Sequence, residues 1–219
     1  MEAHIFKKGV LFIFVMLNFL VLNRCSLKDD CYDQDCVCNW RLFQNMRFIT
    51  CSHLSTFPSL NYSRFVAEPF VYVLDFSSGN RFFSLPANAF ANISIETIKL
   101  SKSNLNWIHR ETFARVVNLK TLFLDSNYLD SFDWLNPVDF SSLITLKIDN
   151  NRIRSIDRIC LLLPSLNNLY LTYNNISSID KIHMLKQLKF LAIDSNQIIS
   201  NGASMENLTN LGFVYASRI

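Results

Sequence analysis

Apolar residues return at a fixed spacing along most of the chain. From residue 95 onward, one pattern occurs five times, with apolar residues at positions 1, 4, 6 and 11 of each unit and a polar residue at position 9. Self-similarity with a period of about 20 to 50 residues is typical of repeat architectures. The units follow one another at intervals of 24, 24, 23 and 22 residues and begin at Ile95, Leu119, Leu143, Leu166 and Leu188.

Each unit predicts a short strand that buries one face. Side chains two apart in a strand point the same way, so positions 4 and 6, such as Leu122 and Leu124, share a face, and position 11 turns back onto the same interior. A single unit cannot cover that face. We therefore expect the units to stack in parallel, which gives a continuous core and one curved sheet.

Position 9 predicts a polar ladder inside the stack. An asparagine amide both donates and accepts, so it can satisfy turn backbone in its own unit and in the adjacent one. We expect the N-terminal end of the ladder to be less regular, because Ser103 replaces asparagine and one residue is inserted before Asn80 in a weaker unit that begins at Val71. The regular positions are Asn127, Asn151, Asn174 and Asn196.

The motif L-x-x-L-x-L-x-x-N-x-L resembles that of leucine-rich repeat proteins. The resemblance covers about residues 31–219 and implies an α/β solenoid, a leucine-rich repeat horseshoe with a curved parallel β-sheet on its concave face. Residues 61–219 would hold about seven units, with the last, at Leu211, uncapped. Among relatives, the chain looks most like extracellular leucine-rich repeat proteins of adhesion, receptor and innate-immune kinds.

The N-terminus predicts export. Residues 1–25 contain Lys7 and Lys8 followed by an apolar run at 9–22, which is the layout of a signal peptide. A retained anchor is the alternative, but the run is shorter than the roughly 20 apolar residues that a span requires. We expect a secreted protein with no membrane span in the mature chain. Four glycosylation sequons fit that route, at Asn61, Asn92, Asn175 and Asn207.

Four cysteines precede the repeats, within a segment that we assign to residues 26–60. Their spacing is Cys31-x4-Cys36-x-Cys38-x12-Cys51, which allows three disulfide connectivities. A zinc site is the rival, although two ligands separated by one residue fit tetrahedral geometry poorly and export favours disulfides. The spacing resembles the N-terminal cysteine cap of extracellular leucine-rich repeat proteins, and this resemblance implies the pairs Cys31–Cys38 and Cys36–Cys51.

One further cysteine, Cys160, lies in the apolar stretch Ile-Cys-Leu-Leu-Leu. It predicts either a buried thiol that packs as a small hydrophobe or an intermolecular disulfide.

Composition argues against several classes of chemistry. The 4 Gly residues form no phosphate-binding motif, and the 4 His residues are too scattered to pair as metal ligands. The net charge of +3 falls to +1 without residues 1–25, because 18 basic and 17 acidic residues remain, whereas a nucleic-acid binder is usually far more basic. We expect no cofactor, no metal and no nucleic-acid partner.

The outward positions of the strands predict a binding surface. Aromatic side chains anchor protein partners and charges at the rim orient them. We expect a protein or peptide ligand and no enzymatic activity, since the aspartates on an open face should be solvated and keep ordinary pKa values. The residues assigned to partner contact are Phe123, Asp125, Lys147, Asp149, Tyr170, Tyr173, Phe190 and Asp194.

The last unit predicts an uncovered end. It stops within a strand and its turn at Ile219, without a cysteine cluster to close the stack. An open strand edge is a template for pairing with another chain. The alternative functions are therefore an assembly subunit that self-associates through this end as a homo- or hetero-oligomer, and a truncated receptor ectodomain.

Overall fold

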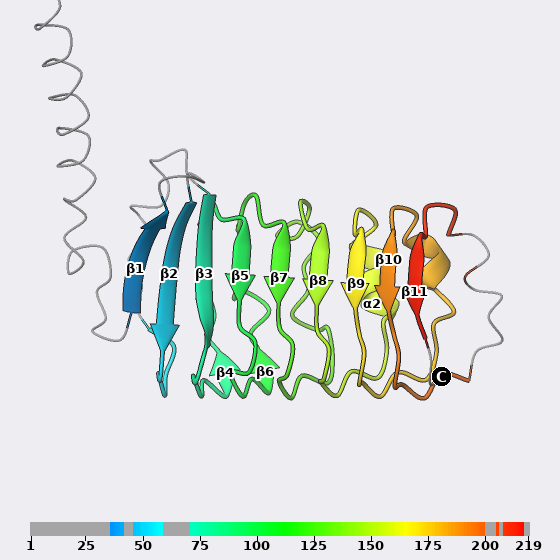
Figure 1. Ribbon diagram of the computed structural model, residues 1–219, viewed down its shortest axis with the longest axis horizontal. Coiled ribbons are helices and arrows are strands. Elements are labelled where there is room, and N and C mark those ends of the chain that lie inside the picture. The colour runs from blue at the N-terminus through cyan, green and yellow to red at the C-terminus, as the bar shows by residue number, and fades with distance from the viewer. Residues whose placement is uncertain (1–35, 42–45, 59–70, 200–204, 206–207, 217–219) are drawn as a thin grey trace, which may run out of the picture.

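The chain forms a curved solenoid built on one large sheet. The computed structural model describes residues 36–41, 46–58, 71–199, 205 and 208–216. Within them, the first two strands pair antiparallel and every later neighbour in the sheet is parallel. In spatial order (Figure 1) the strands are β1 (Cys36–Arg41), β2 (Met46–Ser52), β3 (Val71–Ser78), β5 (Thr97–Lys99), β7 (Thr121–Phe123), β8 (Thr145–Lys147), β9 (Asn168–Tyr170), β10 (Phe190–Ala192) and β11 (Phe213–Tyr215).

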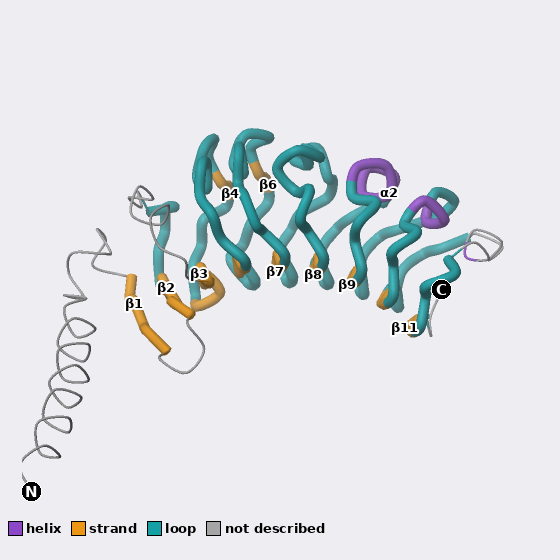
Figure 2. The backbone as a smooth tube through the Cα atoms, turned by 90° about the horizontal axis from the view of Figure 1, so that it is seen from above, coloured by secondary structure: helices purple, strands orange, loops and turns teal. Residues whose placement is uncertain are grey.

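The two sides of the solenoid differ in structure. The strands of the large sheet line the inner side of the arc, and loops with short elements form the outer side (Figure 2). These outer elements are a two-stranded parallel sheet of β4 (Ser84–Leu85) and β6 (Trp107–Ile108), a helix α2 (Asp157–Leu162) and a 3-10 turn η3 (Ile182–Met184). The predicted fold, a leucine-rich repeat solenoid with its parallel sheet on the concave face, is confirmed.

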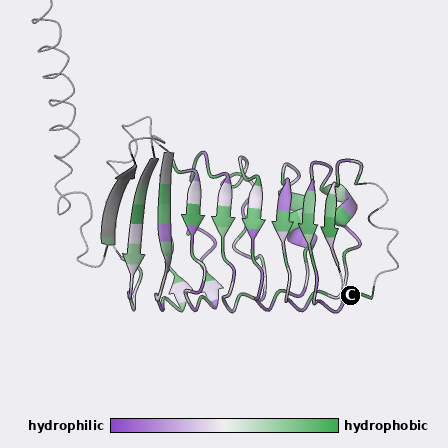
Figure 3. Cartoon of the chain, in the orientation of Figure 1, coloured by the Kyte–Doolittle hydropathy of each residue, from purple (hydrophilic) through white to green (hydrophobic). Residues whose placement is uncertain are grey.

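The core follows the apolar positions of the repeat. Apolar residues recur from strand to strand across the sheet (Figure 3). The core is less complete at the last described strand, β11, where Val214 at position 4 is 43% exposed. In the six preceding units, positions 4 and 6 are completely buried, at Leu74, Phe76, Ile98, Leu100, Leu122, Leu124, Leu146, Ile148, Leu169, Leu171, Leu191 and Ile193.

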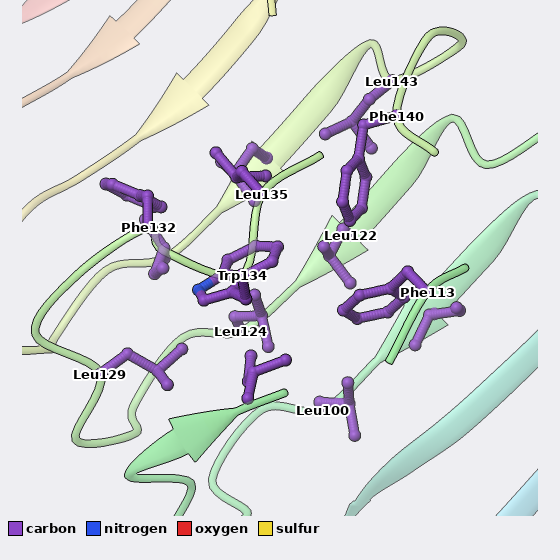
Figure 4. Packing of buried hydrophobic residues seen from close by; sticks show 14 of the residues in the cluster. Leu100, Phe113, Leu122, Leu124, Leu129, Phe132, Trp134, Leu135, Phe140 and Leu143 are labelled. Carbon is purple, nitrogen blue, oxygen red and sulfur yellow. The ribbon is translucent and has the colours of Figure 1, made fainter. Parts of the chain in front are cut away.

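Aromatic rings form a second layer of the core beneath the outer loops. Phe113 stacks on Phe90 with ring centroids 5.3 Å apart and meets Phe140 edge to face at 5.2 Å. Figure 4 shows Phe113, Trp134 and Phe140 pointing toward one another over the leucines of the sheet. We call this chain of contacts the aromatic spine, which comprises Phe57, Phe76, Phe82, Phe90, Phe113, Trp134 and Phe140.

The predicted asparagine ladder is present. The Asn127 amide nitrogen donates to the carbonyls of Leu100 and Leu124 at 2.8 and 2.9 Å, and its Oδ1 accepts the backbone N–H groups of Ser103 and Leu105, both at 3.0 Å. The side chain therefore links two neighbouring units, as expected. Equivalent bonds are made by Asn151, Asn174 and Asn196.

The N-terminal end of the ladder is more regular than the sequence suggested. Asn80 donates to the carbonyls of Cys51 and Phe76 at 2.8 and 2.6 Å, and its Oδ1 accepts the Leu54 N–H at 2.7 Å. The backbone accommodates the extra residue before Asn80, because the preceding Gly79 adopts a left-handed conformation with a φ of 70°. Ser103, which takes the place of asparagine at position 9 of the next unit, links the units more weakly than Asn80 does. Its hydroxyl donates to the Phe76 carbonyl at 3.0 Å.

One of the implied disulfides is present. Cys36 and Cys51 are paired residues of β1 and β2, and a disulfide joins them. Cys31 lies outside the described residues, so its pairing with Cys38 stays an expectation. The signal segment 1–25, Asn61 and Asn207 also lie outside the described part of the chain.

The free cysteine is enclosed in the core. Cys160 is 1% exposed, within α2, and burial together with the nearby Asp157 carboxylate raises the pKa of its thiol to about 12. A neutral, enclosed thiol is a poor nucleophile for disulfide exchange. The structure therefore supports the interpretation of Cys160 as a buried hydrophobe.

Removal of the disulfide is expected to destabilise the N-terminal end. The bridge closes a loop with a sequence separation of 15, and a loop of that length corresponds to about 3 kcal/mol in the chain-entropy model. The double substitution Cys36→Ser with Cys51→Ser should lower the free energy of unfolding by about that amount and reduce the secreted yield. Denaturant unfolding of the parent chain and the double variant under non-reducing conditions measures the first effect. Equal stability of the double variant and the parent chain would contradict this expectation.

Candidate functional site

The concave face is paved by the outward positions of successive strands. Phe123 of β7, Lys147 of β8 and Tyr170 of β9 lie side by side in the same register, one strand apart. The row continues to Ala192 of β10, whose small side chain is buried. Asp125, Asp149 and Asp194 follow these strands two positions further along the chain, and Tyr173 is exposed in the turn after β9.

Polar contacts cross the N-terminal half of this face. The Lys99 ammonium lies 3.4 Å from the Asp75 carboxylate and 6.0 Å from the centre of the Phe123 ring. The Ser101 hydroxyl donates to Asp125 at 2.7 Å. Each contact joins adjacent units, so these polar and charged groups are held in place by the neighbouring strands.

Asp149 has an environment that the sequence did not predict. Burial raises the pKa of its carboxyl, while the backbone N–H of Thr172, which donates to it at 2.8 Å, and the nearby Lys147 ammonium act in the opposite direction. The expectation of ordinary pKa values on this face is therefore wrong for Asp149. The physical reason is that neighbouring strands shield a carboxylate from water even on an open sheet.

Aromatic rings occupy the C-terminal half of the face. The rings of Tyr170 and Phe190 lie 4.7 Å apart, and Phe190 lies 6.3 Å from Tyr215. Phe213 and Tyr215 are 69% and 63% exposed. We call Tyr170, Phe190, Phe213 and Tyr215 the aromatic strip. Tyr170 and Phe190 were assigned to partner contact from the sequence, but the sequence did not predict the ring contacts that link them and Tyr215 across the strands.

Among the described residues, no group of three or more His, Cys, Asp or Glu side chains could hold a metal ion. A side-chain pattern of aromatic rings beside charged groups is suited to contact with another macromolecule.

Comparisons with known proteins agree with the fold. Residues 141–198 match the family model described as leucine rich repeat. The sequence has no match among curated proteins. Together with the stacked units, the matches support a leucine-rich repeat protein.

Solved structures similar to this chain include bacterial and animal proteins. An internalin, inlF, from Listeria monocytogenes is 20% identical with a TM-score of 0.58, and the match covers 67% of this chain and 41% of that one. Human 5T4, or trophoblast glycoprotein, is 19% identical with a TM-score of 0.54 and coverage of 83% and 79%. A TLR13–ssRNA13 complex is 22% identical with a TM-score of 0.57 and coverage of 67% and 21%. This chain thus spans less than half of the internalin and about a fifth of TLR13, and the likeness is one of fold.

No described helix is both long and apolar enough to cross a membrane. The two described sequon residues, Asn92 and Asn175, are exposed.

Proposed function

We propose that this chain is an extracellular, non-enzymatic recognition module that binds a protein partner through its concave face. The observation that carries the proposal is the aromatic strip beside the charged groups of the same sheet. Exposed aromatic rings supply large apolar contact areas at low entropic cost, and neighbouring charges orient the partner.

The size of the face favours a macromolecular ligand. The seven strands of the repeats, from β3 to β11, lie about 4.8 Å apart and together span roughly 30 Å. This width approaches the dimensions of a standard protein interface. A small metabolite requires an enclosed pocket, which an open sheet does not offer. The TLR13 neighbour was solved with single-stranded RNA, but the near-neutral charge of this chain without residues 1–25 favours a protein ligand here.

Two observations support an extracellular location. The Cys36–Cys51 disulfide is of the kind that persists in oxidising compartments. The exposed Asn92 and Asn175 sequons are accessible to glycosylation, which would occur on the secretory route. Both agree with the predicted signal segment at residues 1–25.

Removal of three aromatic rings from the concave face is expected to weaken partner capture strongly. The triple variant Phe123→Ala, Tyr170→Ala and Phe190→Ala should bind its partner at least about tenfold more weakly, because interface energy is concentrated in a few aromatic anchors. The measurement is affinity capture from extracellular fluid with immobilised parent or variant protein, followed by quantification of each captured protein.

The matched control removes exposed aromatic rings from other surfaces. Phe83→Ala with Tyr128→Ala changes two exposed residues outside the strands of the large sheet and should leave capture unchanged. Circular dichroism of both variants verifies folding. Partners that remain bound to the folded triple variant would place the binding site elsewhere and overturn the proposal.

A further inference from the structure

A pocket lies outside the concave face, beside β6. Its volume is about 450 Å³, within the range of small-ligand and peptide-anchor sites. Its lining includes one exposed indole ring, two carboxylates and one guanidinium, contributed by Trp107, Asp130, Asp133 and Arg154. Because β6 is on the outer side of the arc, the pocket is separate from the aromatic strip (Figure 2).

The pocket exists because the outer sheet stops at β6. In the described chain this sheet has two strands, β4 and β6, and β6 has no strand partner on its other edge. In the next unit, the Trp134 indole packs against the core, where it is 4% exposed and its Nε1 donates to the Ser131 carbonyl at 3.2 Å. Figure 4 shows this indole among the leucines. The second wall of the pocket is formed by Leu129, Asp130, Ser131, Asp133 and Trp134 of this next unit.

The lining favours a cation. Trp107 is 54% exposed, and its indole is held edge to face against His109 with centroids 5.5 Å apart. Tryptophan is the best aromatic partner for an ammonium or guanidinium group. Asp130 and Asp133 are both exposed; Asp133 accepts a bond from the Ser131 hydroxyl at 3.2 Å, and the Asp130 side chain has no partner within the described residues.

The third charged group of the pocket, the Arg154 guanidinium, limits what can enter. Arg154 is exposed and forms no salt bridge with Asp130 or Asp133, nor any other side-chain bond in the described part of the chain. The three charged groups sum to −1 at neutral pH, which attracts one cation, while Arg154 repels a second.

We propose that this pocket binds an extended segment of a protein partner that inserts one arginine or lysine side chain. The cationic group would lie against Trp107 and pair with Asp130 and Asp133, and the segment backbone would run along the open edge of β6, as in strand addition. The proposal does not depend on the concave face, so the two sites can be tested separately.

The test uses the full chain and a defined probe. The probe is the blocked peptide acetyl-Gly-Gly-Arg-Gly-Gly-amide, with a second peptide in which uncharged citrulline replaces arginine. Titration is followed by the fluorescence of the exposed indole and by NMR chemical shifts. We expect saturable binding of the arginine peptide at millimolar concentration and much weaker binding of the citrulline peptide.

Substitutions identify the site. Trp107→Phe and Asp130→Asn should each weaken arginine-peptide binding by about two- to fivefold, as expected for one exposed cation–π or ion-pair contact. Glu111→Gln removes an exposed carboxylate that does not line the pocket and should have no effect. The concave-face triple variant should also bind the peptide normally, which separates this proposal from the proposed function.

Three results would overturn the proposal. They are the absence of saturable binding, equal binding of the citrulline peptide, and unchanged affinity in both Trp107→Phe and Asp130→Asn.

Discussion

Replacement of Phe113 by alanine is expected to lower the free energy of unfolding by about 3–5 kcal/mol. The ring is 1% exposed and contacts Phe90, Trp134 and Phe140 of the aromatic spine at centroid distances of 5.3, 5.9 and 5.2 Å. Truncation removes the transfer free energy of the ring and leaves a cavity that rigid neighbouring rings cannot fill. Denaturant unfolding monitored by circular dichroism measures the loss.

Two further variants test whether the loss comes from the spine. Phe113→Leu keeps an apolar side chain of similar volume and should cost less than about 2 kcal/mol. Phe83→Ala removes a phenylalanine that is exposed to solvent and should change the stability by no more than about 0.5 kcal/mol. If Phe113→Ala were no more destabilising than Phe83→Ala, the spine would not contribute to the core.

The second large effect is expected at Asn127. Asn127→Ala should cost about 3 kcal/mol, since it leaves the carbonyls of Leu100 and Leu124 and the N–H groups of Ser103 and Leu105 without their partner inside the stack. An unsatisfied buried group costs about 1–3 kcal/mol, and local rearrangement or water recovers part of the sum.

A matched asparagine provides the control. Asn167 is half-buried directly before β9, and its side chain forms no hydrogen bond within the described chain. Asn167→Ala should therefore change the free energy of unfolding by less than about 1 kcal/mol under the same denaturant titration. A similar loss for both variants would indicate a general effect of asparagine removal and would contradict a specific role for the ladder.

The sequence by itself determined the repeating part of this protein. The burial of Leu124 and Ile148, the parallel order of the strands and the bonds of Asn127 depend on a local pattern of two dozen residues, and stacking applies that pattern again in every unit. The Cys36–Cys51 pair was implied by the resemblance of the cysteine spacing to an N-terminal cap, and the structure contains it.

Tertiary structure decided the features that lie between units. The aromatic spine joins Phe113, Phe140 and Trp134 through residues that lie outside the L-x-x-L-x-L-x-x-N-x-L motif, so the motif does not fix their contacts. The raised pKa of Asp149 depends on shielding by the adjacent strand, and the pocket beside Trp107 depends on where the outer sheet ends. Each of these features arises from the spacing of neighbouring turns in three dimensions, which a one-dimensional period does not specify.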